Sequence, residues 1–379
     1  MKKIGFCFLS HQAHVRHQLP IAVEFSKLYP EFQVDLLVTS DAVLAEVNEN
    51  LKDLSGFNLN INMLSGTLLK TLVGKVKGRL YPNIKNVINN NEKLFFNYDA
   101  LVTPHHTLDR VMELDVNRVI QYICTFHGAG DGEVGFDKRF SAYDLLLTSG
   151  RDIDRRLHRE GIVHLGNESK ITGYTKLENI KTSDFKCFNN DKPIFLYNPH
   201  YEPRLTSWGK WGQEVLRYFS DQDKFNLIFS PHVKLFNGKS PSYLNKYANS
   251  DSVYIDINSG RMMDATYTAQ ADVYLGDVSS QVYEFLYFKE KPVIFLNAQN
   301  VKNWRDDPSY QMWKMGDVIQ DISDLNKVVG CAQGVHKSSY HTIQAGILKD
   351  KFSKTGVAAS VLGAQALHDY ITKKKKTLS

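Results

Sequence analysis

Residues 271–297, with the sequence ADVYLGDVSSQVYEFLYFKEKPVIFLN, constrain the fold more than any other segment. The pattern predicts a short strand (ADVYL), a tight turn (GDVSS), a helix (SQVYEFLYF) and a second strand (KPVIFLN). A strand that leads through a helix into another strand is the building unit of an open parallel sheet. Ligands of such sheets bind beyond the carboxyl ends of the strands, which is where this turn falls.

The turn carries residue types that suit a phosphate. Gly276 and Asp277 follow the strand, and either Ser279 or Ser280 is placed to cap the new helix. Backbone N–H groups and hydroxyls at the start of a helix favour an anion. Glu284, one helical turn after Ser280, is placed to accept both hydroxyls of a ribose. Taken alone, the same residues equally fit an ordinary helix cap and a solvated glutamate.

The same alternation of strand and helix runs through the rest of the chain. The first half has strand-like runs KKIGFCFLS and FQVDLLVTS, followed by LNINML, YDALVTP, RVIQYIC and YDLLLTS, which we expect to be buried strands. After Gly173 come PIFLYNP, FNLIFSP, VYIDI, VYLGD and PVIFLN. We expect a helix that begins near Pro20, a second helix over DAVLAEVNENLKDL, and a closing helix with an apolar face near residues 355–372.

These patterns predict an α/β protein of two Rossmann-like, doubly wound parallel-sheet domains that face a central cleft. A chain of 379 residues is too long for one core. We place the acceptor domain at residues 1–181, the nucleotide-donor domain at 190–350, and a closing helix with a basic tail at 351–379. The polar run SDFKCFNNDK forms the linker. This architecture is GT-B-like, as in nucleotide-sugar transferases.

Composition excludes several classes of protein. The net charge of +5 is too small to indicate nucleic-acid binding, and 42% hydrophobic with 23% charged residues is typical of a globular protein. The apolar runs are too short for a transmembrane helix, and the run at the N-terminus is too short for a signal peptide. Four cysteines lack metal-binding spacing and are expected to be reduced thiols in a cytoplasmic protein: Cys7, Cys124, Cys187 and Cys331.

Basic residues gather in two places. A segment that also contains several leucines carries Lys70, Lys75, Lys77, Arg79 and Lys85, and the chain ends on the lysines of residues 373–376. Such a segment and tail are able to dock on an anionic membrane surface, which would make the protein peripheral on the inner face of the cytoplasmic membrane. A solvated helix face with a frayed tail is the alternative.

Histidines follow two strands of the first half. His11, His14 and His17 stand three residues apart after the first strand, and His105 and His106 follow YDALVT. Histidines at this spacing without a nearby carboxylate or cysteine are a weak metal signal, so we predict neither a metal nor a cofactor. We expect His11, His14 and His105 to contact the acceptor at the carboxyl ends of their strands, and solvated surface histidines are the alternative.

A glycine-rich run, CTFHGAGDGEVGFDKRF, follows the strand that ends at Cys124. It is not a P-loop, because no lysine followed by Ser or Thr closes it, and no helix opens behind it as in a dinucleotide site. His127 is placed where a general base would project, since an imidazole takes a proton near neutral pH. Gly128 allows close approach of the backbone, and Asp131 would orient His127 or act as the base itself.

The second half adds positive charge at two more strand ends. His200 and Arg204 follow PIFLYNP, and His232 and Lys234 follow FNLIFS. The guanidinium of Arg204 suits a phosphate. Together with the turn at 276–280, these residues would form a donor-rich pocket for a diphosphate.

These motifs resemble the CDP-glycerol glycerophosphotransferase family, which makes teichoic-acid and capsule polymers. The resemblance rests on His127-Gly128, on Ser230-Pro231-His232 with Lys234, and on the turn at 276–280 with Glu284 and KPVIF behind it. It is clearest over residues 121–297. It implies a GT-B fold, His127 as the base, and His232 with the Asp-x-Ser-Ser turn as ligands of a CDP diphosphate. The chain departs from the family in its long glycine-rich loop and its histidine-rich first loop.

The resemblance implies transfer of a glycerol phosphate, or a related alditol or sugar phosphate, from a CDP-activated donor to a hydroxyl of a cell-surface glycan or lipid-linked acceptor. CMP would be released and no metal would be required. The alternatives are a nucleotide-sugar glycosyltransferase for capsule or lipopolysaccharide, favoured by a carboxylate base such as Asp131 or Glu133, a nucleotide-sugar epimerase, and a non-catalytic binding protein.

Overall fold

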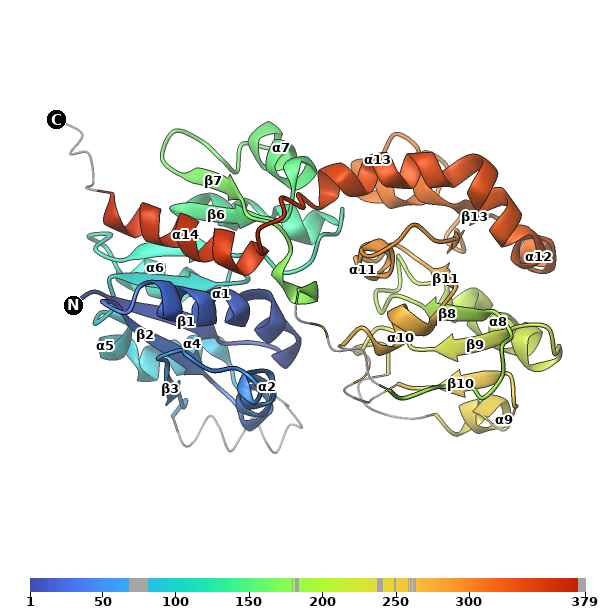
Figure 1. Cartoon of the computed structure of the whole chain (residues 1–379), viewed down its shortest axis with the longest axis horizontal. Helices are drawn as coiled ribbons and strands as arrows, with labels where there is room; N and C mark the ends of the chain where they lie inside the picture. Colours follow the sequence, from blue (N-terminus) through green and yellow to red (C-terminus); the bar gives the residue numbers. More distant parts are fainter. Residues whose placement is uncertain are drawn as a thin grey trace. The chain divides into compact units, whose positions relative to one another are not determined.

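The computed structural model describes residues 1–67, 81–178, 180, 184–236, 241–248, 250–257, 259, 261 and 264–373. The chain forms two compact units. The first comprises Met1–Gly128, Val134–Glu178 and Asp350–Ser379, and the second comprises Ala129–Glu133 and Asn179–Lys349. Each unit is built on its own sheet (Figure 1).

The first unit contains a seven-stranded sheet in the order β3-β2-β1-β4-β5-β6-β7, in which every neighbouring pair is parallel. Its strands are β1 (Lys3–Phe8), β2 (Gln33–Val38), β3 (Asn60–Met63), β4 (Ala100–Thr103), β5 (Gln121–Cys124), β6 (Leu145–Thr148) and β7 (Glu168–Ile171). Its α-helices are α1 (Val15–Leu28), α2 (Asp41–Leu51), α4 (Ile84–Asn90), α5 (Glu92–Phe95), α6 (Asp109–Leu114), α7 (Arg151–Arg159) and α14 (Ala359–Thr372).

The second unit contains a six-stranded parallel sheet in the order β10-β9-β8-β11-β12-β13. Its strands are β8 (Ile194–Asn198), β9 (Asn226–Phe229), β10 (Val253–Ile255), β11 (Val273–Gly276), β12 (Val293–Leu296) and β13 (Asp317–Ile319). Its α-helices are α8 (Trp208–Ser220), α9 (Asn245–Ala248), α10 (Thr266–Gln270), α11 (Gln281–Leu286), α12 (Leu325–Val335) and α13 (His341–Lys351), whose last two residues belong to the first unit.

The strands are apolar along their whole length because both faces of each sheet are covered. In β1, Phe6 and Phe8 pack in a core with residues of α1, α2 and α14, whereas Cys7 packs in a separate core on the other face with residues of α4, α6 and α7. This alternation is what a doubly wound parallel sheet requires. The two Rossmann-like sheets confirm the predicted fold class.

The closing helix α14 lies against α1 in the first unit (Figure 1). The contact is close, because a side chain at Gly363 would meet Ile21. Nζ of Lys2 also donates to the carbonyl of Ile371 at 2.7 Å. Residues 351–379, set apart in the sequence analysis, thus contain a helix that completes the core of the first unit. Of the basic tail, Lys373 forms an ion pair with Glu168 at 3.1 Å, and residues 374–379 lie outside the described part of the chain.

Two details of the sequence prediction were wrong in the first half. The helix predicted to begin near Pro20 begins at Val15 and includes Pro20. Burial of Val15 and Leu19 on the sheet outweighs the one backbone hydrogen bond that proline removes. The run LNINML forms β3, but β3 is a mostly exposed edge strand rather than a buried one.

Two edge strands were not predicted. Among the described residues, β7 (ESKI) pairs with β6 alone and β13 (DVI) with β12 alone. An edge strand needs fewer apolar residues than a central one, so neither segment shows the continuous apolar run by which the central strands were recognised. The basic segment at residues 70–79 lies outside the described residues.

Gly150 offers a test of how the end of α13 is held in the first unit. A Cβ at this position would collide with the carbonyl oxygens of Asp350 and Lys351, which are backbone atoms that cannot swing away. We expect Gly150→Ala to lower the free energy of unfolding by about 1–3 kcal/mol in urea titrations. Gly209→Ala, at an open position in α8, is the control and should leave stability unchanged or raised by up to about 1 kcal/mol. Equal stability of the two variants would contradict this packing.

Candidate functional site

Each sheet reverses its strand order once, and a reversal is where a doubly wound sheet opens a crevice for a ligand. In the first unit the reversal lies between β1 and β4, and in the second between β8 and β11. The loops that leave the carboxyl ends of these strands are therefore the places to look for a site. Most of the residues singled out in the sequence lie on them.

In the first unit, six histidines gather at the carboxyl ends of β1, β4 and β5. We call this the histidine cluster, and its members are His11, His14, His17, His105, His106 and His127. The ring of His127 lies 4.5 Å from that of His14 and 4.6 Å from that of His105, measured between centroids. His14 and His105 stack in parallel at 6.0 Å. The structure thus joins three histidines that the sequence placed in separate loops.

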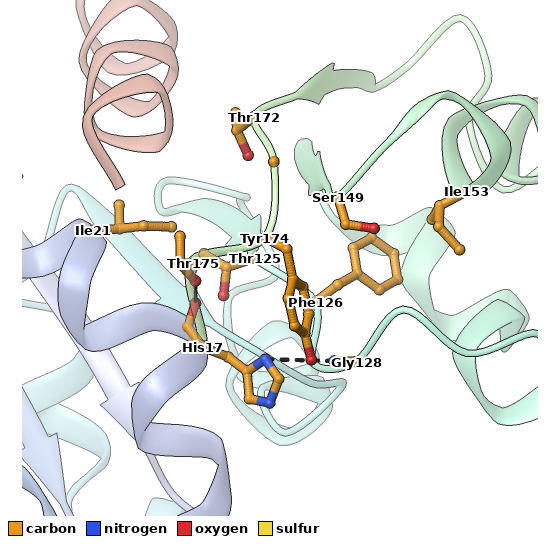
Figure 2. Close-up of a pocket in the computed structure, with 11 residues that line it drawn as sticks. His17, Ile21, Thr125, Phe126, Gly128, Ser149, Ile153, Thr172, Tyr174 and Thr175 are labelled. Carbon is orange, nitrogen blue, oxygen red and sulfur yellow. Dashed lines mark hydrogen bonds between the residues drawn. The ribbon is translucent and has the colours of Figure 1, made fainter. Parts of the chain in front are cut away.

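The orientation of His127 suits a general base. Its Nδ1 lies 3.1 Å from the carbonyl oxygen of Pro104. A carbonyl only accepts, so Nδ1 carries the proton and the lone pair of the neutral ring is on Nε2. The next residue, Gly128, has a φ of 81°, which favours glycine. Its N–H points to Nδ1 of His17 at 3.5 Å (Figure 2).

The other rings are held by neighbouring polar groups. Oγ of Ser10 and Nδ1 of His14 are 2.7 Å apart. Nδ1 of His11 accepts from the N–H of Ala13 at 3.1 Å, and the His11 ring packs on Tyr81 at 4.9 Å. These contacts fix the first turn after β1, so the rings are positioned before any ligand binds.

Four side chains of the histidine cluster are kept neutral by their surroundings. Burial, followed by repulsion from neighbouring histidines, lowers the pKa of His14 well below its usual range. Burial and the charge of Lys176 do the same to His17. The pKa of His105 is lowered to about 2 and that of His106 to about 4, with burial again the largest cause. At neutral pH these four side chains are therefore uncharged.

A small cavity lies beside the cluster, between His17 and α7. Its volume is about 20 Å³, and His17, Thr125, Ser149 and Tyr174 contribute polar atoms to its wall (Figure 2). A space of this size holds about one water molecule. It is too small for a substrate.

In the second unit, Asp277 ties two loops together. Its side chain is fully buried, and its Oδ2 accepts from the N–H of His200 at 2.8 Å and from that of Ser207 at 2.9 Å. The carboxylate thus fixes the loop after β8 and the start of α8. Burial raises its pKa to about 7. Asp277 was predicted to bind the donor, and these contacts give it a positioning role beneath the turn.

The turn after β11 has the features predicted for the start of a helix. Oγ of Ser279 accepts from the N–H of Gln281 at 3.3 Å, and Ser280 is the residue that precedes α11. Gly276 is the last residue of β11 and has no positive φ. Glycine is required there because a Cβ would lie 3.0 Å from the carbonyl oxygen of Asn198. Glu284 is buried on α11.

Basic and aromatic side chains on the loops after β8 and β9 lie close to one another. The ring of His232 is 5.5 Å from that of His200 and 4.4 Å from that of Tyr201, and Nζ of Lys234 lies 5.1 Å from the Tyr201 ring. Burial lowers the pKa of His200 to about 4. Arg204, by contrast, is 88% exposed and pairs with Glu202 at 3.0 Å. Tyr201 was missed in the sequence, although it lies directly beside His200.

Asp131 belongs to the second unit and is buried there. Its Oδ2 accepts from the hydroxyl of Tyr283 at 2.5 Å and from the N–H of Met312 at 3.2 Å. A Cβ at Gly130 would lie 3.1 Å from Cβ of Ser280. Gly130 therefore lets the 129–133 segment pack on the turn after β11, and Asp131 anchors it. From the sequence, Asp131 was predicted to orient His127 or to act as the base itself.

Within the described part of the chain, no three His, Cys, Asp or Glu side chains are arranged to hold a metal ion. None of the helices described is long and apolar enough to cross a membrane.

Comparison with known proteins shows the fold. No protein-family model matches the chain, and no curated protein matches its sequence. Among solved structures, a putative UDP-N-acetylglucosamine 2-epimerase from Listeria monocytogenes is similar over 99% of this chain and 98% of its own, with a TM-score of 0.65 and 15% identity.

Two further structures are similar over 98% of this chain. S. aureus MnaA, solved with UDP, has a TM-score of 0.62 and 14% identity and is covered over 96% of its length. The wall teichoic acid polymerase TagF, solved with CDPG, has a TM-score of 0.61 and 14% identity and is covered over 88%. The chain therefore has a GT-B-like fold of two Rossmann-like domains.

Because the carboxyl group of Asp277 is buried, the free energy of unfolding should depend on pH. Its pKa is raised in the folded state, so between about pH 4 and 7 the folded protein keeps a proton that the unfolded chain has lost. The stabilising contribution of Asp277 is full below pH 4 and is lost as the pH rises to 7. Relative to Asp277→Asn, the native protein should lose at most about 1.4 kcal/mol of unfolding free energy per pH unit in this window. Urea titrations at several pH values test this, and a constant difference would contradict it.

Proposed function

We propose that this chain is a transferase related to the CDP-glycerol glycerophosphotransferases. It moves a glycerol phosphate, or a related alditol or sugar phosphate, from a CDP-activated donor to a hydroxyl of a cell-surface glycan or lipid-linked acceptor. The observation that carries the proposal is the state of His127. Its Nδ1 lies against the carbonyl of Pro104, so the lone pair of the neutral ring is on Nε2. Its ring lies close to those of His14 and His105, which are on the loops after β1 and β4.

The second unit would bind the donor. His232, Lys234, Ser279 and Ser280 follow β9 and β11, and they offer a cation, hydroxyls and one ring N–H group to a diphosphate. Glu284 would accept from ribose hydroxyls. Arg204 would bind the diphosphate only after its ion pair with Glu202 breaks. Because the Arg204 side chain is 88% exposed, breaking this pair costs little free energy.

The first unit would supply the acceptor site and the base. Nε2 of His127 takes the proton of the acceptor hydroxyl as its oxygen attacks the phosphorus of the transferred group. The bond from that phosphorus to the oxygen of the cytidylate breaks, and CMP leaves with the electron pair. His11, His14, His105 and Gly128 would hold the acceptor. The charge that develops is met by protein donors, so the step uses neither a metal nor a cofactor.

Similar proteins support nucleotide chemistry without deciding the donor. TagF was solved with CDPG, and MnaA with UDP. The second candidate is a nucleotide-sugar enzyme, either a glycosyltransferase or an epimerase. It is supported by the similar structure of a putative UDP-N-acetylglucosamine 2-epimerase and by that of MnaA, which was solved with UDP. A glycosyltransferase with Asp131 as its base is disfavoured, since that carboxylate holds Tyr283 and Met312.

Docking on the inner face of the cytoplasmic membrane is part of the proposal. It rests on the lysines at residues 373–376, of which Lys373 pairs with Glu168.

Nucleotide binding tests the donor. A ligand that binds only the folded protein stabilises it by about 2.7 kcal/mol at 100 times its Kd. We expect CDP or CMP to raise the melting temperature of the protein, and UDP, GDP and ADP to do so less. Ser280→Ala should lose the shift because the variant lacks a hydroxyl at the turn. Ser338→Ala, an exposed serine outside the site, is the matched control.

A shift with UDP or GDP but not with cytidine nucleotides would contradict the CDP donor and support the second candidate. A cytidine shift that Ser280→Ala leaves intact would contradict the location of the donor site.

A further inference from the structure

The strand β7 is one edge of the sheet in the first unit. Among the described strands it pairs with β6 alone, so its other side is open to a further strand. The N–H groups of Glu168 and Thr172 donate on the β6 side, at 3.0 and 2.9 Å. Because backbone groups alternate between the two sides of a strand, those of Ser169 and Ile171 point to the open side. These are the groups that another strand would use.

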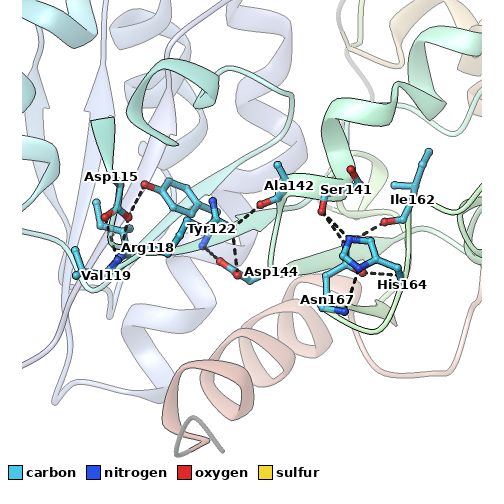
Figure 3. Close-up of polar contacts among 12 residues, drawn as sticks. Asp115, Arg118, Val119, Tyr122, Ser141, Ala142, Asp144, Ile162, His164 and Asn167 are labelled. Carbon is cyan, nitrogen blue, oxygen red and sulfur yellow. Dashed lines mark hydrogen bonds and ion pairs between the residues drawn. The ribbon is translucent and has the colours of Figure 1, made fainter. Parts of the chain in front are cut away.

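The segment that leads into β7 is already fixed by side-chain contacts. Asn167 donates from its amide to the carbonyl of Ser141 at 3.3 Å and accepts from the N–H of His164 at 2.9 Å (Figure 3). The ring of His164 lies 3.1 Å from the same carbonyl (Figure 3). A strand that is ordered in advance loses little conformational entropy when it pairs with another.

The charged residues of β7 are complementary to those of a second, antiparallel β7. Glu168 and Lys170 stand two residues apart, so their side chains share one face of the sheet, where their charged groups are 3.7 Å apart. A lysine on an edge strand commonly keeps other strands away. Here a carboxylate of the same strand offers the matching charge. The strand also contains no proline, and its register with β6 is unbroken.

We propose that β7 pairs with β7 of a second copy of this chain, antiparallel and about a two-fold axis that passes through Ser169. The sheets of the two first units then continue into each other across the dimer. This inference goes beyond the proposed function and does not depend on it, because it concerns only the edge of the sheet.

The charges select this register. In an antiparallel pair related by a two-fold axis through a residue, that residue lies opposite itself. An axis at Glu168 or at Lys170 sets like charges directly opposite each other, which is destabilising. An axis at Ile171 forms no pair of opposite charges. An axis at Ser169 sets each Glu168 opposite Lys170 of the other copy, and the outward N–H and carbonyl of the two Ser169 residues bond to each other.

Apolar surface beside β7 would be covered in this dimer. Ser169 faces α7, because its Oγ donates to a carboxylate of that helix at 2.6 Å, and Ile171 shares this face and is 38% exposed. An open hollow of about 470 Å³ borders the start of β7, and the fully exposed Leu165 contributes to its wall. In the proposed register, Ile171 of the second copy lies opposite Asn167, which also lines the hollow. Burial of these side chains adds to the backbone pairing.

Sedimentation velocity of the full chain tests the inference. We expect the native protein to be dimeric at about 100 µM and to dissociate on dilution. Lys170→Glu and Glu168→Lys should each weaken the dimer at least tenfold, because each variant sets like charges opposite each other twice. An equimolar mixture of the two variants should dimerise again, since every charge pair across the axis is then of opposite sign.

Two further variants separate backbone pairing from general charge effects. Ile171→Pro removes an outward N–H and leaves the bonds to β6 in place, so it should weaken the dimer about tenfold. Lys93→Glu changes an exposed lysine in α5 of the same unit and is the matched charge control. It should dimerise as the native protein does. Melting curves check that each variant is folded.

Three results would overturn the inference. The first is a native protein that stays monomeric at about 100 µM. The second is a dimer that persists undiminished in both charge variants or in Ile171→Pro, which would place the interface elsewhere. The third is an equimolar mixture of the charge variants that remains monomeric, which would exclude the register about Ser169.

Discussion

Two parallel sheets, each covered on both faces and each reversing its strand order once, are the constraint on which the rest of this structure depends. Because all strands run the same way, the loops that carry polar residues leave from one edge of each sheet. The reversal between β1 and β4 collects histidines, and that between β8 and β11 collects hydroxyls and basic groups. The cores are made of apolar side chains, and the candidate functional residues lie at these two edges.

The two edges use buried polar groups differently. Asp277 is a fully buried carboxylate that holds two loops by their backbone N–H groups. Burial disfavours the charged form of Asp277, so this carboxyl group lowers the stability of the folded protein at neutral pH. Burial lowers the pKa of four histidines in the cluster, so protonation of these rings in acid costs stability. Precise positioning of site residues is therefore obtained at the expense of stability, as is common at functional sites.

The sequence predicted the central elements and the edges at which the site residues lie, because apolar runs and strand ends are local patterns. It did not predict β7 or β13, whose residues lack an apolar run, nor the start of α1 ahead of Pro20. The roles of two carboxylates also depend on distant contacts. Asp131 bonds to Tyr283 and Met312, which are over 150 residues away in the chain, and no local pattern reveals such partners.

The central claim is that His127 is the base of a reaction that releases CMP. The most direct measurement is the rate of CMP release from CDP-glycerol in the presence of glycerophosphoglycerol as acceptor, for the native protein and for His127→Asn. We expect the native protein to release CMP in step with formation of a new phosphodiester. In His127→Asn the rate of CMP release should fall by about 100-fold or more. The variant should still bind CMP. Absence of turnover in the native protein, or undiminished release in the variant, would contradict the account.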